Sequence, residues 1–507
     1  MDKRVAVIDL GSNSARLTIW NINERGGFSV IERAKETVRL SEGLVESGVL
    51  KPEPMERAFE TIRVFARLIK NKQADLVWPV ATEALRRASN ASVFTSRIKA
   101  ETGLEFNIIS GGEEAEYDFR GVVNSIYVSD CLIADVGGAS TELVLIKNRE
   151  VKRRVSLPFG AVTLTEEFWP ENKNTESAEL DKFRIGLLAY VRGRLGELGW
   201  LDEARGLPLV ALGGSMRALG RLSQKLKNYP LELLHGYSLK AREVRDLINM
   251  LLDLPLKKRA ELPSVDKKRA EILPGGLAPL FALMEKFGLD SFIASEASLR
   301  EGVFFSHYLS GNPIVGDVVD FSARNLIRVY GQDEAHSEHV LRISAALYQQ
   351  LAPLHKADGY YLRPLKAAAM LHDIGQLINY EEHEKHGFYL TLNAGLNGLS
   401  HRELVLAAML VGMHRIKDLK IDPKAYNNIL QEGDFENIKK LSLILKLAEK
   451  LDRNSTGAVR DLKCFIRESE LEIRLIAGKG AEAIVSAAMT SEKSFEKIYG
   501  RKLIVSC

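Results

Sequence analysis

The chain has 507 residues, of which 46% are hydrophobic and 27% charged, a composition that is typical of soluble globular proteins and excludes a disordered one. Basic and acidic side chains nearly cancel, 70 against 67. The net charge of +3 excludes a strongly basic nucleic-acid coat but allows a local basic groove. At roughly 150 residues per domain, this length predicts about three domains, which need neither disulfides nor metals to stay folded.

Cysteine usage and hydropathy indicate the compartment. The three cysteines, Cys131, Cys464 and Cys507, are odd in number and form no CxxC pattern, which favours a reducing environment over a disulfide framework or a thiolate zinc site. The N-terminus has no secretory apolar region. The longest apolar runs, such as Leu404 to Met413, are shorter than the roughly 18–20 residues that cross a bilayer. We therefore expect a cytoplasmic protein that has no membrane partner.

One pattern occurs twice in the N-terminal half. It reads VAVIDLGSNSARLTI at residues 5–19 and CLIADVGGASTELVL at residues 131–145, with Asp, Gly, Ser and Leu recurring 126 residues apart. Each copy has an apolar run, a turn of Gly and Ser, and a second apolar run, which predicts a β-hairpin. Two copies in matching context favour duplicated α/β halves over a chance match.

Helical and strand patterns follow these hairpins. Apolar residues recur with the 3.6-residue period from Met55 to Ile69, which predicts a helix. Strands are predicted at residues 76–80, 106–109 and 209–212, and a helical stretch follows the last of them. Strands mixed with helices predict layered α/β structure.

The composition changes at residues 310–316, which contain Gly, Asn and Pro. Helix-period patterns then dominate to about residue 452, and strand-like runs at 464–466, 471–476 and 503–505 close the chain. The predicted fold class is therefore α/β, followed by an all-α domain and a small α+β piece. The predicted domains cover residues 1–125, 126–308, 309–458 and 459–507.

Asp9 and Asp135 each stand at the end of a predicted strand, directly before a glycine turn. Carboxylates on rigid elements suit Mg²⁺, which proteins usually hold by one or two acids together with water and phosphate oxygens. Glycines let backbone N–H groups approach an anion, and hydroxyl or amide side chains add donors. The alternative is that D-x-G-x-x-S is only a hairpin turn; one copy favours that alternative, and two copies favour facing phosphate loops. The predicted phosphate-binding residues of the two loops are Asp9, Gly11, Ser12, Asn13, Ser14, Gly137, Gly138, Ser140 and Thr141.

Two adjacent acids, Glu113 and Glu114, follow the predicted strand at 106–109 in the segment SGGEEAEY. A carboxylate near a terminal phosphate can accept a proton from attacking water. The alternative, which these residues alone favour, is that the acids stabilise a helix N-terminus through its dipole. Arg86 presents a similar choice between bidentate contact with phosphate oxygens and a surface ion pair.

Seven motifs occur in order over residues 5–303: DLGSNSARL, ATEALRRA, SGGEEAE, ADVGGASTEL, LPFGAVTL, ALGGSMRAL and SLREG. Together they resemble the exopolyphosphatase/guanosine pentaphosphate phosphohydrolase (Ppx/GppA) family of the actin-like, sugar kinase and heat-shock ATPase superfamily. The resemblance implies a duplicated ribonuclease-H-like fold with the active site between the halves. It also implies Mg²⁺-dependent hydrolysis of a terminal phosphoanhydride and a homodimer with the helical C-terminal half as the contact.

The resemblance implies roles for individual residues by their positions in the motifs. This sequence departs from the family pattern at two places. Ala139 stands where many members have a third glycine, and the third loop reads Gly213-Gly214-Ser215 instead of SGT. The resemblance implies that Ala139 and these three third-loop residues also bind phosphate. An alanine is strained at such a position only if its φ is positive. The resemblance implies Glu114 as the catalytic base, Arg86 as a phosphate-binding arginine, and Asp9, Asp135, Gly137 and Glu142 as phosphate-loop residues, with Asp9, Asp135 and Glu142 as the Mg²⁺ ligands.

Eight of the ten histidines lie between His336 and His414. Histidines and an aspartate that point inward from different helices can build an N/O site for Mg²⁺, Mn²⁺ or Fe, although a lone buried histidine is usually a hydrogen-bonded core residue. The segment AAAMLHDIG resembles the HD-domain metal phosphohydrolases. That resemblance implies a second divalent metal on His339, His372 and Asp373, with His386 and His414 as further ligands and Glu449 in the place of the closing aspartate, three residues before Asp452.

The leading prediction is an exopolyphosphatase that removes terminal phosphates processively from inorganic polyphosphate. The alternative within the same chemistry is a guanosine pentaphosphate 5′-phosphohydrolase, although the sequence reveals no base pocket. Other classes remain open: a sugar-kinase-like phosphotransferase, an HD-type nucleotide phosphodiesterase and a non-catalytic phosphate sensor. The basic clusters at 257–259 and 267–269 could guide a polyanion, although a solvated helix face is the commoner role of such clusters. No nucleic-acid partner is expected.

Overall fold

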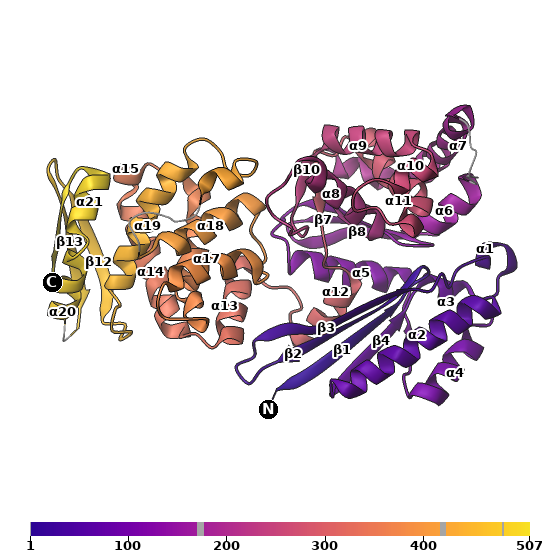
Figure 1. The fold of residues 1–507 in the computed structure, drawn as a ribbon, viewed down its shortest axis with the longest axis horizontal. Helices are drawn as coiled ribbons and strands as arrows, with labels where there is room; N and C mark the ends of the chain where they lie inside the picture. Colours follow the sequence, from indigo (N-terminus) through magenta and orange to yellow (C-terminus); the bar gives the residue numbers. More distant parts are fainter. Residues whose placement is uncertain (1, 170–176, 416–421, 479–480) are drawn as a thin grey trace. The chain divides into compact units, whose positions relative to one another are not determined.

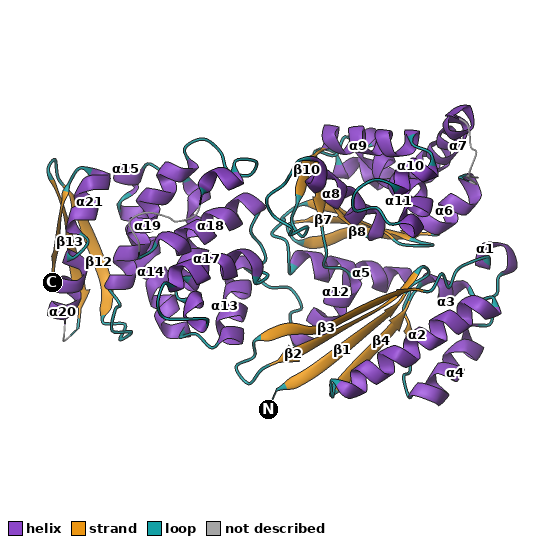
Figure 2. Ribbon diagram, viewed as in Figure 1, coloured by secondary structure: helices purple, strands orange, loops and turns teal. Residues whose placement is uncertain are grey.

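The computed structural model describes residues 2–169, 177–415, 422–478 and 481–507 (Figures 1 and 2). The chain forms two compact units. The first consists of Met1–Ile22 and Ser29–Gly316, and the second consists of Asn23–Phe28 and Asp317–Cys507. The boundary at Gly316 lies in the segment where the composition changes, whereas the finer division at residues 125 and 458 stays a prediction.

The first sheet of the N-terminal unit has five strands in the order β3-β2-β1-β4-β5. Strand β1 pairs antiparallel with β2 and parallel with β4, and β4 pairs parallel with β5. The β1–β2 hairpin forms where the sequence predicts it, because two apolar runs flank a short turn of Gly, Ser and Asn. The strands are β1 (Lys3–Leu10), β2 (Ser14–Ile22), β3 (Phe28–Thr37), β4 (Leu76–Ala81) and β5 (Asn107–Ile108).

Helix α2 (Pro52–Asn71) contains the predicted helix and contributes to the core of the first sheet. Its buried side chains recur at helical spacing, as the apolar face of an amphipathic helix requires. Proline at the first helical position starts it without losing a backbone hydrogen bond. The neighbouring helices are α1 (Leu44–Ser47), α3 (Glu83–Arg87) and α4 (Ala91–Thr102).

The second sheet repeats the topology of the first. Its order is β10-β11-β9-β6-β7-β8, so that β8-β7-β6-β9-β11 corresponds to β3-β2-β1-β4-β5. Strand β6 pairs antiparallel with β7 and parallel with β9, as β1 does with β2 and β4. This repetition accounts for the duplicated sequence pattern. The strands are β6 (Cys131–Val136), β7 (Thr141–Lys147), β8 (Glu150–Leu157), β9 (Leu209–Leu212), β10 (Ser238–Lys240) and β11 (Ser291–Ala294).

Helices α5 (Gly111–Val123) and α12 (Leu299–Tyr308) link the two sheets. Helix α5 packs on β7 and β8, α12 packs on β1, and the two helices pack against each other. Their close approach requires Gly302, since a Cβ atom there would lie 1.8 Å from the carbonyl oxygen of Tyr117. Helix α5 is therefore held firmly on the side that faces α12.

Helix α11 (Lys267–Lys286) runs through the core of the second half, and every residue from Leu273 to Met284 is buried. The side chain of Asp266 caps its N-terminus by accepting a hydrogen bond from the N–H of Arg269 at 2.7 Å. The other helices around this sheet are α6 (Ala161–Phe168), α7 (Ser177–Gly196), η1 (Gly199–Ala204), α8 (Gly214–Leu226), α9 (Ala241–Asp253) and α10 (Leu256–Ala260).

The second unit is helical, as the 3.6-residue patterns predict, and ends in a three-stranded sheet in the order β12-β13-β14. The three predicted strand-like runs all lie within these strands. Among the described residues, no helix combines the length and apolar character that a membrane crossing requires. The elements are α13 (Val318–Tyr330), α14 (Glu334–Gln350), α15 (Ala352–His355), η2 (Gly359–Tyr361), α16 (Leu362–Leu371), η3 (Ile374–Leu377), α17 (His383–Asn393), α18 (His401–Met413), η4 (Pro423–Tyr426), α19 (Asp434–Lys450), β12 (Val459–Ile466), β13 (Glu470–Ala477), α20 (Ala481–Met489), α21 (Glu492–Tyr499) and β14 (Lys502–Ser506).

Candidate active site

The two strand-end aspartates line one cavity of the first unit. Asp9 lies opposite Arg16 across the β1–β2 pair, and Asp135 lies opposite Glu142 across the β6–β7 pair. Equivalent positions of the two hairpins therefore each hold an aspartate, whereas the residues paired with these aspartates, Arg16 and Glu142, have opposite charges.

The turns after these aspartates are alike. Gly11 donates its N–H to the carbonyl oxygen of Ser14 at 3.1 Å, and Gly137 donates to that of Ser140 at 3.0 Å. The sequence left open whether D-x-G-x-x-S is a hairpin turn or a phosphate loop. The structure has hairpin turns whose residues also line the cavity.

The two turns approach each other closely at Gly138. A Cβ atom there would lie 3.1 Å from the backbone nitrogen of Asn13, which is closer than most side-chain contacts. The N-terminus of α6 holds the second turn, since the N–H of Ala161 donates to Gly137 and that of Val162 to Gly138. Ala139, the departure from the family pattern, is buried and has no positive φ, so it fits without strain.

The adjacent acids at the start of α5 have different environments. Glu113 forms a capping box with Ser110, whose N–H donates to the Glu113 carboxylate at 2.8 Å. Glu114 instead lines the cavity with Asp9 and Asp135. The helix-start interpretation therefore describes Glu113, while Glu114 is available for chemistry.

Arg86 contacts Glu114 directly. Its Nη1 donates to Oε2 of Glu114 at 2.9 Å and to the carbonyl oxygen of Ile109 at 2.7 Å, and its Nη2 donates to Glu83 at 2.7 Å. Burial raises the pKa of Glu114 to about 8, although Arg86 opposes that rise. Arg86 therefore fixes the orientation of the acid and does not itself line the cavity.

A cluster of buried carboxyls lies behind and around the cavity. Glu142 and Asp118 have relative exposures of 1% and 0%, and burial, together with neighbouring acids, raises the pKa of both well above the usual range. Burial also raises the pKa values of Asp9 and Asp135, against the charge of Arg16. Among the described residues, neither carboxyl oxygen of Asp118 has a hydrogen-bond partner. Carboxylates in this setting stay ionised only beside cations.

This donor set fits a hard divalent cation. Asp9 and Asp135 present oxygen ligands to the cavity, and none of the described residues that line it is a cysteine or histidine. Mg²⁺ prefers such a set, completed by water and phosphate oxygens. The buried carboxyl of Asp118 has no hydrogen-bond partner among the described residues, and it would be ionised only beside such a cation.

Arginines supply positive charge that the sequence alone did not reveal. Arg16 and Arg269 line the cavity, whereas the neighbouring Lys268 is exposed. Burial lowers the pKa of Arg269, and burial with the charges of Arg16 and Arg300 lowers the pKa of Arg217 to about 9. Guanidinium groups that lower one another's pKa favour an anion between them.

The predicted residues divide into those that line the cavity and those that support it. Thr141 is one of the supports, because its hydroxyl donates to the carbonyl oxygen of Phe159 at 2.7 Å. The lining contains Asp9, Gly11, Ser12, Asn13, Ser14, Glu114, Asp135, Gly137, Gly138, Ser140, Gly213 and Gly214; it does not contain Arg86, Ala139, Thr141, Glu142 or Ser215. Prediction from sequence omitted Arg16, Asp118 and Arg217, and it named Arg269 only as part of the basic cluster at 267–269.

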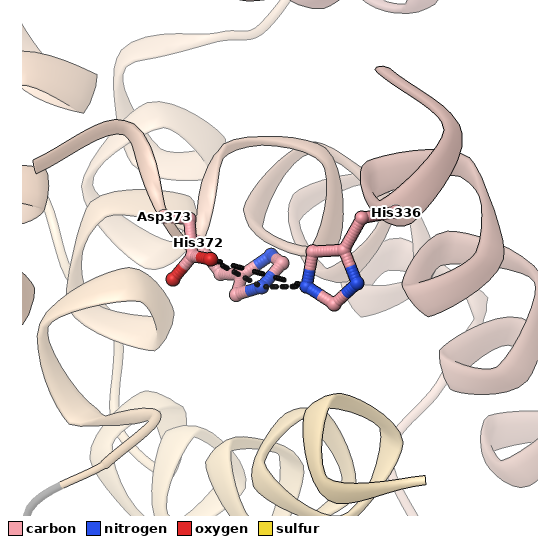
Figure 3. A group of neighbouring side chains, drawn as sticks. All are labelled: His336, His372 and Asp373. Carbon is pink, nitrogen blue, oxygen red and sulfur yellow. Dashed lines mark hydrogen bonds and ion pairs between the residues drawn. The ribbon is translucent and has the colours of Figure 1, made fainter. Parts of the chain in front are cut away.

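The second unit brings His336, His372 and Asp373 together (Figure 3). The Nε2 atoms of the two histidines are 3.2 Å apart, and Oδ2 of Asp373 lies 3.9 Å from the first and 3.7 Å from the second. Asp373 also forms a group with His383 and His414. Three of the residues predicted from the HD resemblance, His372, Asp373 and His414, thus belong to these groups.

The other predicted ligands lie elsewhere. His339 is one helical turn beyond His336, and its Nε2 faces the carbonyl oxygen of Val459 at 2.8 Å. Glu449 forms an ion pair with Arg415 at 2.7 Å. His386 belongs to neither group among the described residues. His336 and His383, which the HD resemblance did not assign, complete the groups instead.

Comparison with known proteins identifies the family. The sequence model of the Ppx/GppA phosphatase family matches residues 18–310, and that of Ppx/GppA phosphatase domain III matches residues 318–482. The chain belongs to the Ppx/GppA phosphatase family. It is therefore a hydrolase of phosphoanhydride bonds, with an actin-like α/β fold and a helical C-terminal domain III, in a family that depends on divalent metals.

Individual relatives carry different names. The guanosine-5′-triphosphate,3′-diphosphate pyrophosphatase of Aeromonas hydrophila is 30% identical over 484 residues, which cover 93% of this chain and 92% of the relative. The Ppx/GppA family member of Aquifex aeolicus is 30% identical with a TM-score of 0.52, covering 62% of this chain and 99% of that one. An exopolyphosphatase from Cytophaga hutchinsonii, 24% identical with a TM-score of 0.55, covers 62% and 100% and is similar in fold. These names leave the substrate open.

Proposed function

We propose that this protein is a Mg²⁺-dependent exopolyphosphatase that removes terminal phosphates processively from inorganic polyphosphate and releases orthophosphate. The observation that carries the proposal is the single cavity at which two glycine turns, two strand-end aspartates and Glu114 meet. Polyphosphate offers neither ring nor base, so its recognition depends on backbone amides, cations and metal.

Asp9 and Asp135 are the residues that would hold Mg²⁺, with the buried carboxyls of Glu142 and Asp118 behind them. When bound, the ion neutralises charge on the transferring phosphoryl group and its leaving oxygen. The remaining contributions come from the chain. Backbone N–H groups of the two turns bind the terminal phosphate, and Arg16 and Arg269 attract the following units.

Glu114 receives the proton of the attacking water. Its Oε2 accepts the hydrogen bond from Arg86, which leaves Oε1 to orient the water and take the proton. Arg86 is a positioning residue, because its guanidinium is anchored by Glu83 and Ile109 and holds the carboxylate in place. Only the end of a polyphosphate chain fits between the two glycine turns, and each catalytic cycle therefore releases one orthophosphate.

The proposal also includes a homodimer with the helical C-terminal half as its contact, and a cytoplasmic location. The resemblance to the family supports the dimer. The sparse, scattered cysteines, none of which is paired among the described residues, support a reducing compartment.

A second candidate function is removal of the 5′ phosphate of guanosine pentaphosphate. The name of the Aeromonas relative favours it. Against it, none of the described residues that line the cavity is aromatic, so no ring is present there on which guanine could stack.

Orthophosphate release from long-chain polyphosphate and from guanosine pentaphosphate, measured side by side with Mg²⁺, tests the proposal. We expect the higher kcat/KM with polyphosphate, and a loss of roughly 10²–10⁴-fold in Glu114→Gln with either substrate. A higher kcat/KM with guanosine pentaphosphate would establish the second candidate. Loss of phosphate release in Asp373→Asn but not in Glu114→Gln would assign the hydrolytic activity to the second unit. No phosphate release from either substrate would indicate a phosphate sensor.

A further inference from the structure

Asp118, on helix α5, is a buried acid that the fold leaves without a partner. Its exposed fraction is 0%, and neither of its carboxyl oxygens has a hydrogen-bond partner among the described residues. A polar group in this position destabilises the folded state, and a charged group does so more strongly. The packing of α5 therefore gives no reason for an acid here.

Other buried acids of the chain are satisfied. Asp434 is almost as deeply buried, but it accepts hydrogen bonds from Arg402 at 2.7 Å and from the hydroxyl of Tyr361 at 2.6 Å. Glu142, in the first unit, accepts a hydrogen bond from the hydroxyl of Ser156 at 2.7 Å. The unsatisfied acid of α5 thus differs from buried carboxyls that stabilise the fold.

The position of Asp118 on α5 lies between the cavity and the apolar core. Glu114, one helical turn earlier, lines the cavity, and Val122, one turn later, belongs to a core that includes residues of β6, β7 and β9. Helix α5 packs on β7, the strand that carries Glu142. Asp118 is therefore placed behind the cavity wall, on the side of the second hairpin.

Four acids of the site face Asp118. Burial is the main cause of its raised pKa, and Asp135, Glu142, Glu114 and Asp9 raise that pKa further, in decreasing order. Among the described residues, however, no three of these acids bring ligand atoms within 4.8 Å of one another. Ligands on opposite sides of one Mg²⁺ ion are only about 4.2 Å apart. The acids are therefore spread too widely for Asp118 to join Asp9 and Asp135 in direct contact with the ion.

Water fills a gap of this size. Mg²⁺ loses its water reluctantly, and it usually keeps several water molecules while one or two carboxylates bind it directly. A carboxylate that accepts a hydrogen bond from such a water lies roughly 4–5 Å from the ion. Outer acceptors of this kind orient the inner ligands. A carboxyl with two unpartnered oxygens, such as that of Asp118, suits this role because each oxygen can accept.

We propose that Asp118 is a positioning residue of the phosphatase site, which accepts hydrogen bonds from water bound to a Mg²⁺ ion that Asp9 and Asp135 hold. The inference rests on the metal site of the proposed function but not on which substrate is hydrolysed. It also makes Asp118 a determinant of metal choice. Water-mediated contact favours Mg²⁺, which stays hydrated, over Ca²⁺, whose coordination is larger and more flexible.

Mg²⁺-dependent stability of the full-length protein tests the proposal. Urea unfolding is followed by tryptophan fluorescence, because all four tryptophans belong to the first unit, and the gain in stability with Mg²⁺ concentration gives the Kd. We expect Asp118→Asn to raise the Kd of Mg²⁺ by roughly 10- to 100-fold, the effect of losing an outer partner. Glu116→Gln, which removes a carboxylate of the same helix that pairs with Arg154 at 2.6 Å, is the control and should change the Kd by less than a few-fold.

The same unfolding measurement in EDTA separates positioning from a structural role. Asn keeps the shape of the side chain and removes an unpartnered acid, so the metal-free variant should be as stable as the wild type or more stable. A metal-free Asp118→Asn protein that is less stable than the wild type would assign Asp118 to the fold and overturn the proposal. An unchanged Kd of Mg²⁺, or a wild type that Mg²⁺ does not stabilise, would overturn it as well.

Replacing Mg²⁺ by Ca²⁺ separates contact through water from an effect of charge. We expect Asp118→Asn to weaken the binding of Ca²⁺ less than that of Mg²⁺, whereas equal losses would show that Asp118 acts through its charge alone and contradict the proposal. None of these measurements uses a substrate. A wild-type protein that binds Mg²⁺ but releases no phosphate would therefore refute the proposed function and leave the role of Asp118 intact.

Discussion

Neighbouring residues of the same type have different roles at the start of α5. Glu113 completes the helix cap, whereas Glu114 lines the cavity and contacts Arg86. The sequence predicts a pair of acids at this position but not which of them turns inward, because both the cap and the cavity accept a carboxylate. The resemblance to the family was needed to choose Glu114.

Replacing each acid separates the two roles. We expect Glu114→Gln to lower kcat by roughly 10²–10⁴-fold with little change in unfolding temperature, because Gln keeps the shape but cannot take a proton. We expect Glu113→Ala to keep kcat within a few-fold and to lower the free energy of unfolding by about 0.5–2 kcal/mol, since the capping box is lost. Steady-state phosphate release and thermal unfolding give the two values; equal losses of activity would contradict the division.

Arg269 shows a second limit of prediction at this scale. The run at 267–269 is basic throughout, yet only Arg269 lines the cavity, because the cap at Asp266 sets the rotation of the first turn of α11. The order of charged residues in the sequence does not reveal how this helical turn is rotated, and therefore which of the three side chains faces the cavity.

Removing the guanidinium tests its contact with the substrate chain. We expect Arg269→Ala to raise KM by roughly 10- to 100-fold, the loss of a charged hydrogen bond, with a smaller change in kcat. Lys268→Ala is the matched control, because Lys268 is adjacent and exposed, and it should change neither value by more than a few-fold at physiological salt. Similar KM values for the two variants would exclude Arg269 from the contact.

At the scale of elements, the two hairpins and the amphipathic helix α2 follow from the sequence, whereas β3 and β8 do not. Both hairpins and α2 form where period and turn signals predict them. Strands β3 and β8, which each form one edge of a sheet, were not predicted, because their half-exposed residues lack a continuous apolar run. Strand β5, the other edge of the first sheet, lies within the predicted strand at 106–109. Once the two hairpins are known, the duplicated topology predicts that a third strand pairs with each of them.

The spacing of the two turns depends on Gly138. We expect Gly138→Ala to lower kcat/KM by roughly 10- to 100-fold, because the added methyl group pushes the second turn away from Asn13 and misplaces the phosphate donors. Gly193→Ala, on an exposed face of α7 with open space around it, should keep kcat/KM and stabilise the protein by about 0.5–1 kcal/mol. Unchanged kcat/KM in Gly138→Ala would show that activity does not require the close approach of the two turns.

At the scale of the whole molecule, the change of composition at residues 310–316 marks the boundary at Gly316, whereas the assembly of the acid cluster could not be predicted from the sequence. Glu114, Asp118, Asp135 and Glu142 come from α5, β6 and β7, and only packing of these elements buries them together. Asp118 lies one helical turn after Glu114, which is the signal that sequence analysis could have used.

The cluster makes the stability of the first unit depend on pH. Carboxyls whose pKa is raised by folding bind protons more tightly than in the unfolded chain, so stability is greatest at low pH and falls as pH rises. We expect the free energy of unfolding in EDTA to fall between about pH 5 and pH 8, because the pKa of Glu114 is raised to about 8 in the folded protein. The expected slope is about 1.4 kcal/mol per pH unit for each carboxyl that is protonated in the folded protein but ionised in the unfolded chain.

Tryptophan fluorescence isolates this effect, because all four tryptophans, Trp20, Trp78, Trp169 and Trp200, belong to the first unit. Asp118→Asn should flatten the pH dependence, and Mg²⁺ should restore stability at pH 8, since it binds the folded site. Stability that rises with pH in EDTA would show that the acids are ionised and balanced by the arginines alone.

The residues paired with the two strand-end aspartates, Arg16 and Glu142, have opposite charges and also differ in their access to the cavity. Arg16 lines the cavity, whereas Glu142 is 1% exposed and does not line it. Two equal copies of the hairpin would present the same groups to a ligand from both sides. Because only the first hairpin contributes a charged group from this pair of positions, the duplicated fold has a cavity with unlike sides.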